Sequence, residues 1–243
     1  VNILGIDPDV ENDAGDTPLI AACRKLQTSC LSYLLIQNVN VNHKNREGTT
    51  GLIAACDVQT NSIQGAKGYE EHHEKLTVCV QLLLKYGANP LKKGGERQTA
   101  LHKAARFALS DTIKVLLQTI SHSITQDING NTALHTALQY GCWQNAELLI
   151  EYTNDVNIKN DQGKTPLHDL CAHLSLVDGS RSTTGIMMID KLMSKGAAVE
   201  TRDVCGNTPL VDLLRQNHTK VAEVLLSSDL DVKSVNFLSQ NVL

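Results

Sequence analysis

Three histidines recur along the chain at intervals of 33 residues, at His102, His135 and His168. Such a row could hold metal ions, because the neutral imidazole nitrogen is a common metal ligand. Each histidine lies three positions after a Thr, in the phrases TALHKAA, TALHTAL and TPLHDLC. Other copies of the phrase carry apolar residues at this position, which are Ile20, Ile53 and Val211. The row is therefore incomplete as a metal array, and the histidines belong to a repeated structural phrase.

The most metal-like string in the chain is EEHHE, from Glu70 to Glu74. On a helix, Glu70 would share a face with His73 and Glu74. The string lacks the two histidines four positions apart that zinc-protease helices use, and a solvated helix end explains it better. No GxSxG, GxxxxGK[ST] or GxGxxG phrase occurs. We therefore predict no catalytic residue, no cofactor site and no metal site, and a protein that is not an enzyme.

The phrase that holds the histidines occurs six times, and its spacing organises the chain. Each copy has a turn sequence, a Thr, a Leu two positions later and a further apolar pair. The six Thr residues are Thr17, Thr50, Thr99, Thr132, Thr165 and Thr208. Their spacings are 33, 49, 33, 33 and 43 residues. Two copies therefore carry insertions of 16 and 10 residues into a period of 33.

A period of 33 residues that carries T-P-L-H-x-A resembles the ankyrin-repeat family. The resemblance implies an all-α solenoid, in which helix-turn-helix units stack and are joined by β-hairpin loops. It also implies that each Thr caps the first helix of its unit and that the histidine bonds the backbone of a neighbouring hairpin. Stacked repeats have no single active-site cleft, so their default function is to bind another macromolecule.

The Thr register predicts where each repeat begins and ends. Residues 1–12 form the tail of a preceding repeat, the full repeats are 13–45, 46–94, 95–127, 128–160, 161–203 and 204–236, and residues 237–243 begin a truncated seventh. We expect the parent array to continue in both directions. The insertions lie at about 57–75 and about 173–185, between the two helices of their repeats. Both are expected to be surface loops, although the segment from Tyr69 onward could extend the following helix.

The fourth repeat illustrates the expected core. Leu134 and Ala137 should face inward from its first helix. The second helix should be lined by Ala146, Leu148, Leu149 and Ile150. A left-handed cap should end the second helix of each repeat, twelve residues before the next Thr. Ile120 and Thr153 occupy that position on either side of repeat four, so irregular helix ends are expected there.

Composition limits the classes of partner. The 243 residues carry a formal net charge of −4, which argues against a general nucleic-acid binder. No uncharged apolar stretch approaches the roughly 18 residues of a membrane-spanning helix. We therefore predict protein partners, with no nucleic acid and no membrane, for a monomeric module within a longer chain.

The seven cysteines follow the repeat positions. Cys23, Cys56 and Cys171 each lie six residues after a repeat Thr, and Cys30 and Cys79 begin the apolar stripe of a second helix. Free thiols at such positions act as small hydrophobic residues. Seven is an odd number and no CxxC occurs, so neither a disulfide framework nor a zinc site is predicted. A reducing compartment, the cytoplasm or nucleus, fits this usage.

The ankyrin resemblance also predicts a partner-binding surface on the concave side. Partners there contact the hairpin tips and the two residues that end each first helix. The candidates are Arg24, Lys25, Arg46, Glu47, Arg106, Phe107, Asn129, Asn131, Gln139, Tyr140, His173 and Arg215. Phe107 and Tyr140 stand out, because aromatic residues are enriched in binding hot spots. The alternative for Phe107 is packing on Leu109 or a neighbouring helix, and Trp143 is expected to pack rather than bind.

These residues predict a scaffold or adaptor that binds a partner protein. The alternatives are a regulatory inhibitor that masks a partner, and a substrate-targeting domain of a larger multidomain enzyme. A further alternative is that the insertions form a metal or peptide site of their own. Asn42 and Asn157 stand where the resemblance implies substrates of an asparaginyl hydroxylase, although an ordinary turn Asn also explains them.

Overall fold

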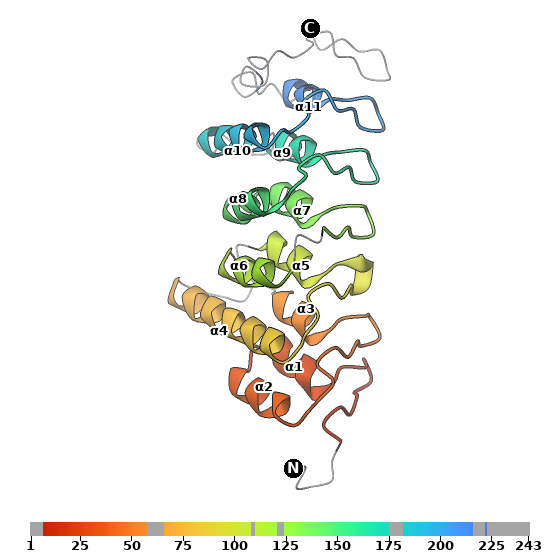
Figure 1. The fold of residues 1–243 in the computed structure, drawn as a ribbon, viewed down its shortest axis with the longest axis vertical. Helices are drawn as coiled ribbons and strands as arrows, with labels where there is room; N and C mark the ends of the chain where they lie inside the picture. The colour runs from red at the N-terminus through yellow and green to blue at the C-terminus, as the bar shows by residue number, and fades with distance from the viewer. Residues whose placement is uncertain are drawn as a thin grey trace. The chain divides into compact units, whose positions relative to one another are not determined.

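The computed structural model describes residues 7–57, 66–107, 110–120, 124–174, 182–215 and 222. The chain divides into two compact units, Val1–Ile128 and Asn129–Leu243, and each unit is described by itself. Both are built from short helices joined by loops (Figure 1). No strand occurs among the residues that the structure describes. The all-α class is thus confirmed, while the loops between repeats are tight hairpin turns without a strand ladder.

The first unit consists of helix pairs stacked one on the next. Its described helices are α1 (Pro18–Arg24), α2 (Thr28–Leu35), α3 (Gly51–Cys56), α4 (Ala66–Lys85), α5 (Ala100–Arg106) and α6 (Ser110–Thr119), with a 3-10 turn, η2 (Gly95–Arg97), before α5. The first helices form one layer, in which α1 contacts α3 and α3 contacts α5. The second helices form another, in which α4 contacts both α2 and α6. Each pair therefore covers the apolar face of its neighbour, as repeat stacking requires.

The second unit repeats this arrangement. Its described helices are α7 (Ala133–Gln139), α8 (Trp143–Tyr152), α9 (Pro166–Leu174), α10 (Ser182–Ser194) and α11 (Pro209–Arg215). Helix α9 contacts α7 and α11 in the layer of first helices, and α10 contacts α8 in the layer of second helices. The residues at the ends of α7, α9 and α11 are thereby placed along one side of this unit.

The repeat Thr residues begin the first helices, as predicted. The hydroxyl accepts a hydrogen bond from the backbone N–H three residues later at Thr17, Thr50 and Thr132. At Thr99 and Thr132 the histidine three positions later completes a capping box. Two otherwise unpaired backbone donors are satisfied in each box, which fixes the start of the helix.

The histidines connect neighbouring repeats. His135 Nδ1 accepts from the backbone N–H of Thr132 at 3.2 Å, and its Nε2 lies 3.1 Å from the carbonyl oxygen of Lys164 in the next repeat. A carbonyl oxygen can only accept, so Nε2 carries the hydrogen. His168 makes the same contact to the carbonyl oxygen of Asn207 at 3.2 Å. Burial lowers the pKa of His168, so this imidazole is neutral and structural.

The first insertion is more helical than predicted. Helix α4 begins at Ala66 and runs for 20 residues, so the expectation of a loop to about residue 75 is wrong from residue 66 onward. The Glu71–Lys75 pair, 2.7 Å apart at i,i+4 spacing, favours this extension. Residues 58–65 lie outside the described part.

The second insertion is also shorter as a loop than predicted. Helix α9 continues to Leu174 and α10 begins at Ser182. The ends of the predicted 173–185 loop are therefore helical, and residues 175–181 lie outside the described part.

The inward face of α8 differs from the prediction at one residue. Ala146, Leu149 and Ile150 are buried, but Leu148 is only half-buried. Residues at i, i+3 and i+4 share a helix face, and Leu148 lies two positions from Ala146. Thr153 has φ −74° and ψ 143°, whereas Gly87 and Gly196 adopt the left-handed cap. The predicted irregular end of α8 is thus confirmed.

The cysteines are all free thiols. Cys23, Cys56, Cys79 and Cys171 are buried, as predicted. Cys30 is exposed, so its assignment to a buried stripe is wrong. Cys79 lies on α4, which packs against α2, the second helix of the preceding repeat. For Cys30 on α2, the described residues include no second helix of an earlier repeat that could cover it.

Candidate partner-binding surface

The hairpin tips are held by a recurring pattern of hydrogen bonds. At the base of a tip, Asn45 Oδ1 accepts from two backbone N–H groups of its own loop, those of Glu47 and Thr49. Asn12, Asn160 and Asp203 repeat this pattern in their loops. Adjacent tips are also joined, because the N–H of Arg46 donates to the carbonyl of Ala14 at 3.2 Å. The exposed tip side chains are therefore carried on ordered backbone.

Two of the predicted residues in the first unit, Arg24 and Glu47, meet at one place. Arg24, at the end of α1, pairs with Asp16 at 3.1 Å and lies 4.0 Å from Glu47. Burial acts to raise the pKa of Asp16, but hydrogen bonds from Arg24 and Asn45 outweigh it and lower the pKa. Arg24 is thus already engaged by the tips.

The exposed residues Lys25 and Arg46 differ from Arg24. Lys25 makes no ion pair within the described residues, and neither does Arg46. Both ammonium and guanidinium groups are therefore available to a partner.

Arg106 and Phe107 form a cation–π contact at the end of α5. The guanidinium carbon of Arg106 lies 5.7 Å from the centroid of the Phe107 ring, within the range of such contacts. Arg106 is exposed and Phe107 is half-buried. Leu109, the alternative contact for Phe107, lies outside the described part.

In the second unit, Asn131 and Gln139 have structural contacts. Asn131 is buried, and its Oδ1 accepts from Asn160 Nδ2 at 2.9 Å and from Gln139 Nε2 at 3.5 Å. Gln139 also donates to Asp169 Oδ2 at 3.0 Å. Asn129 is exposed at its tip, and its carbonyl accepts from the N–H of Asp161. Asn131 thus supports this surface from beneath.

Tyr140 is the large exposed residue of this surface, with half of its area accessible. The carbonyl of the neighbouring Gln139 is bonded to His173 Nδ1 at 2.9 Å. The His173 ring packs edge-on against Trp143 with centroids 5.3 Å apart, so Trp143 packs as predicted. Arg215 is exposed at the end of α11. Phe107 and Tyr140 belong to different units. That both contribute to one partner-binding surface therefore stays a prediction.

A contact register that the sequence interpretation missed runs beside these residues. The residue seven positions after one repeat Thr meets the residue four positions after the next. Asp57 pairs with Lys103 at 3.1 Å in the first unit, and Gln139 bonds Asp169 in the second. In the next pair of repeats, the residue seven positions after the Thr is Ala172, whose side chain cannot donate a hydrogen bond. The residue four positions after the next Thr is Asp212, and its Oδ2 is buried without a hydrogen-bond partner. Positions four and seven after a repeat Thr lie three residues apart and so share one face of the first helix. That shared face is the signal from which the register could have been predicted.

The two carboxyl groups of this register in the second unit, those of Asp169 and Asp212, are unusual. Burial is the main cause that raises the pKa of Asp169, to about 7, and Asp212 adds to it. Burial likewise raises the pKa of Asp212. Asp169, which accepts the hydrogen bond from Gln139, therefore changes its charge near neutral pH.

Asn42 and Asn157 have matching roles in the two units. Asn42 Nδ2 donates to the carbonyl of Gly87, and its Oδ1 accepts from the N–H of Asn89, both at 2.8 Å. Asn157 makes the same pair of bonds to the next repeat, at 2.8 and 2.7 Å. Both amides therefore bridge repeats.

We predict that an asparaginyl hydroxylase adds one oxygen to each of Asn42 and Asn157. Because both amides are held by two hydrogen bonds, reaction should be faster in mild denaturant, which opens these bonds locally. Intact-mass measurement and peptide mapping check this, with Asn42→Ala and Asn157→Ala as controls. An unchanged mass after incubation with active enzyme would contradict the prediction.

Among the described residues, no group of three or more His, Cys, Asp or Glu side chains is placed to hold a metal ion. Within the EEHHE string, Glu71 is paired with Lys75, and the rings of His72 and His73 are half-buried. Nor is any described helix long and apolar enough to cross a membrane.

Comparison with known proteins agrees with this architecture. The family model for ankyrin repeats in three copies matches residues 1–67, 71–160 and 120–179. Dog Inversin is 28% identical over 221 residues, covering 90% of this chain and 19% of Inversin. The E3 ubiquitin-protein ligase KEG of Arabidopsis thaliana is 24% identical over 237 residues, covering 85% of this chain and 14% of the ligase. The human ASB11 ankyrin repeat domain superposes with a TM-score of 0.72 at 21% identity, covering 93% and 90% of the two chains.

The stacked helix pairs, Thr caps and ordered tips define a repeat module that binds proteins. The chain belongs to the ankyrin-repeat family. It spans less than a fifth of the length of the curated relatives described above.

Proposed function

We propose that this module acts as a scaffold or adaptor by binding a partner protein on its concave surface. That surface comprises the hairpin tips and the C-terminal ends of the first helices. The observation that carries the proposal is the exposure of Tyr140 and Arg106 at two such helix ends. Large aromatic and Arg side chains at ordered positions are the residue types that dominate binding energy.

Preorganisation adds to this argument. Arg106 is stacked on the Phe107 ring, so less side-chain freedom is lost when a partner contacts it. Its guanidinium can then pair with a partner carboxylate or stack on a partner ring. The seven free thiols fit a reducing compartment, and we include the cytoplasm or nucleus in the proposal.

Truncation of Phe107 or Tyr140 to Ala is expected to weaken partner binding by about 2 kcal/mol or more. The partner is captured from lysate with the wild-type chain, identified by mass spectrometry and then titrated as a purified protein. Tyr86→Ala is the matched control, because Tyr86 is an exposed aromatic residue that follows α4, away from the first-helix ends. Wild-type affinity in both Phe107→Ala and Tyr140→Ala, with normal melting, would place the contact surface elsewhere.

A second candidate is a substrate-targeting domain of a larger enzyme. It is favoured by the similarity to KEG, an E3 ubiquitin-protein ligase of which this chain matches 14%. A regulatory inhibitor that masks a partner would use the same surface. Competition for the captured partner's other ligands separates an inhibitor from a scaffold.

A further inference from the structure

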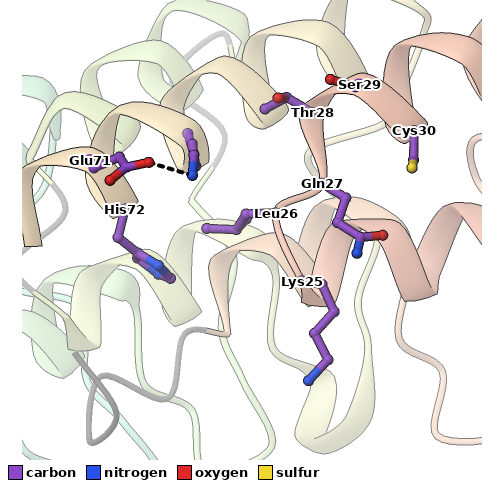
Figure 2. A pocket seen from close by; sticks show the side chains of 9 residues that line it. Lys25, Leu26, Gln27, Thr28, Ser29, Cys30, Glu71 and His72 are labelled. Carbon is purple, nitrogen blue, oxygen red and sulfur yellow. Dashed lines mark hydrogen bonds and ion pairs between the residues drawn. The ribbon is translucent and has the colours of Figure 1, made fainter. Parts of the chain in front are cut away.

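A cavity of about 550 Å³ lies in the first unit, beside the end of α1 (Figure 2). One wall is the turn between α1 and α2 with the first turn of α2. The other wall is the N-terminal half of α4, which contributes Glu71, His72 and Lys75. This volume is within the usual range for ligand pockets, of about 300–1,000 Å³.

The wall from α4 exists because of the first insertion. Residues 66–75 precede the part of the helix that a 33-residue repeat requires, and they extend α4 alongside the turn of the first repeat. The cavity is therefore a feature of this chain rather than of the repeat as such.

The opposite wall contains a strained residue. Leu26 has φ +47°, which is a rare conformation for a bulky side chain. The corresponding position of the fourth repeat is Gly141, with φ +65°. Leu26 is nonetheless buried and lines the cavity, so its side chain gives the cavity an apolar floor. Strained residues of this kind cluster at functional sites.

The cavity is lined by two lysines and one carboxylate, together with the polar side chains of Gln27, Thr28 and Ser29. Lys25 makes no ion pair in the described part of the chain, and the hydroxyls of Thr28 and Ser29 make no hydrogen bond there. Helix α2 has no side-chain cap at its start. The one carboxylate in the lining, Glu71, is bonded to Lys75. The charge that remains unpaired in the lining is the Lys25 ammonium, so a negatively charged occupant suits the cavity.

The Glu71–Lys75 pair does not block such an occupant. Both side chains are at least half exposed, and exposed ion pairs of this kind contribute little. Lys75 can exchange Glu71 for a ligand carboxylate at small cost. His72 Nε2 in the same wall is buried without a hydrogen-bond partner.

We propose that this cavity binds an acidic peptide segment of a partner protein, with one carboxylate paired with Lys25 and another with Lys75. The volume exceeds what one small anion fills, and Leu26 and Cys30 offer apolar contact to the rest of the segment. The proposal rests on the protein-binding role above. The cavity shares Lys25 with the predicted concave surface, but its wall from α4 is not part of that surface. The chain would thus hold a partner at two places, which raises its apparent affinity.

The test is an NMR titration of the full ¹⁵N-labelled chain with a capped peptide, acetyl-Gly-Glu-Glu-Leu-Gly-amide. Saturable shifts are expected for the amides of Thr28 to Cys30 and of the first half of α4. Lys25→Gln should weaken binding, with a dissociation constant about tenfold higher. The matched control is Lys85→Gln at the far end of α4, which should leave the titration unchanged, and circular dichroism verifies that each variant is folded.

Three results would overturn the proposal. They are no saturable shift with the Glu peptide, equal binding of its Gln counterpart, and the same shifts at the same concentration of inorganic phosphate, which would show an anion site only. Phe107→Ala should not alter this titration, so failure here is distinguishable from failure of the concave surface.

Discussion

Leu149→Ala should lower the free energy of unfolding by about 2–5 kcal/mol. Leu149 is 5% exposed on α8, which contacts α7 and α10. Truncation removes buried apolar atoms and leaves a cavity that neighbouring helices fill only in part. The change is measured by urea unfolding. The dependence of the unfolding free energy on urea concentration is taken as the same for both proteins, because a single-site substitution that preserves the fold should shift only the midpoint.

The adjacent Leu148→Ala is the control for this experiment. Leu148 is half-buried on the same helix, so its truncation should cost less than half as much. Equal losses for the two substitutions would mean that the face of α8 is assigned wrongly. A loss below about 0.5 kcal/mol for Leu149→Ala, the range of surface substitutions, would mean the same.

The difference between Leu148 and Leu149 shows where sequence reasoning stops. Thr132 and the phrase around it predict the start of α7, because the cap is local chemistry repeated six times. The run Leu148-Leu149-Ile150 is apolar throughout, so periodicity cannot select the two residues that face inward. Contacts with the neighbouring repeats make that selection.

The insertions lie outside the period, so the repeat says nothing of their structure. The sequence from Tyr69 onward hinted at a helical extension, yet α4 already begins at Ala66. The cavity beside α4 depends on this extension meeting Lys25 and its neighbours from the first repeat. A contact between an insertion and a distant turn has no signal in either segment alone.

The resemblance to ankyrin repeats predicts which residues form the concave surface. It does not predict the hydrogen bonds that these residues make within the protein. Gln139 was expected to face a partner, but it bonds Asp169, which the prediction did not include. Asp169 looks like an ordinary polar helix residue in the phrase TPLHDLC. Only its burial by neighbouring repeats makes its charge state important.

Asp169→Asn should stabilise the protein at pH 8 by on the order of 3 kcal/mol. Asp169 is 5% exposed, and burial raises its pKa from 3.8 to about 7. Between these values the folded chain holds a proton that the unfolded chain has released, so stability falls as pH rises from about 4 to about 7. Above that range the cost of burying the charge is constant. The Asn side chain avoids this cost and can still accept the hydrogen bond from Gln139.

The measurement is urea unfolding of both proteins at several values from pH 5 to pH 8. The wild-type chain should lose stability across this range, and Asp169→Asn should lose much less. A smaller slope should persist, because the pKa of Asp212 is also raised. Asp190→Asn, at an exposed position of α10, should retain the wild-type slope. A less stable Asp169→Asn at pH 8, or an unchanged slope, would show that the carboxylate is held charged by contacts stronger than the Gln139 bond. Because Gln139 lies at the end of α7 that we propose faces a partner, the charge of Asp169 should also affect this surface near neutral pH.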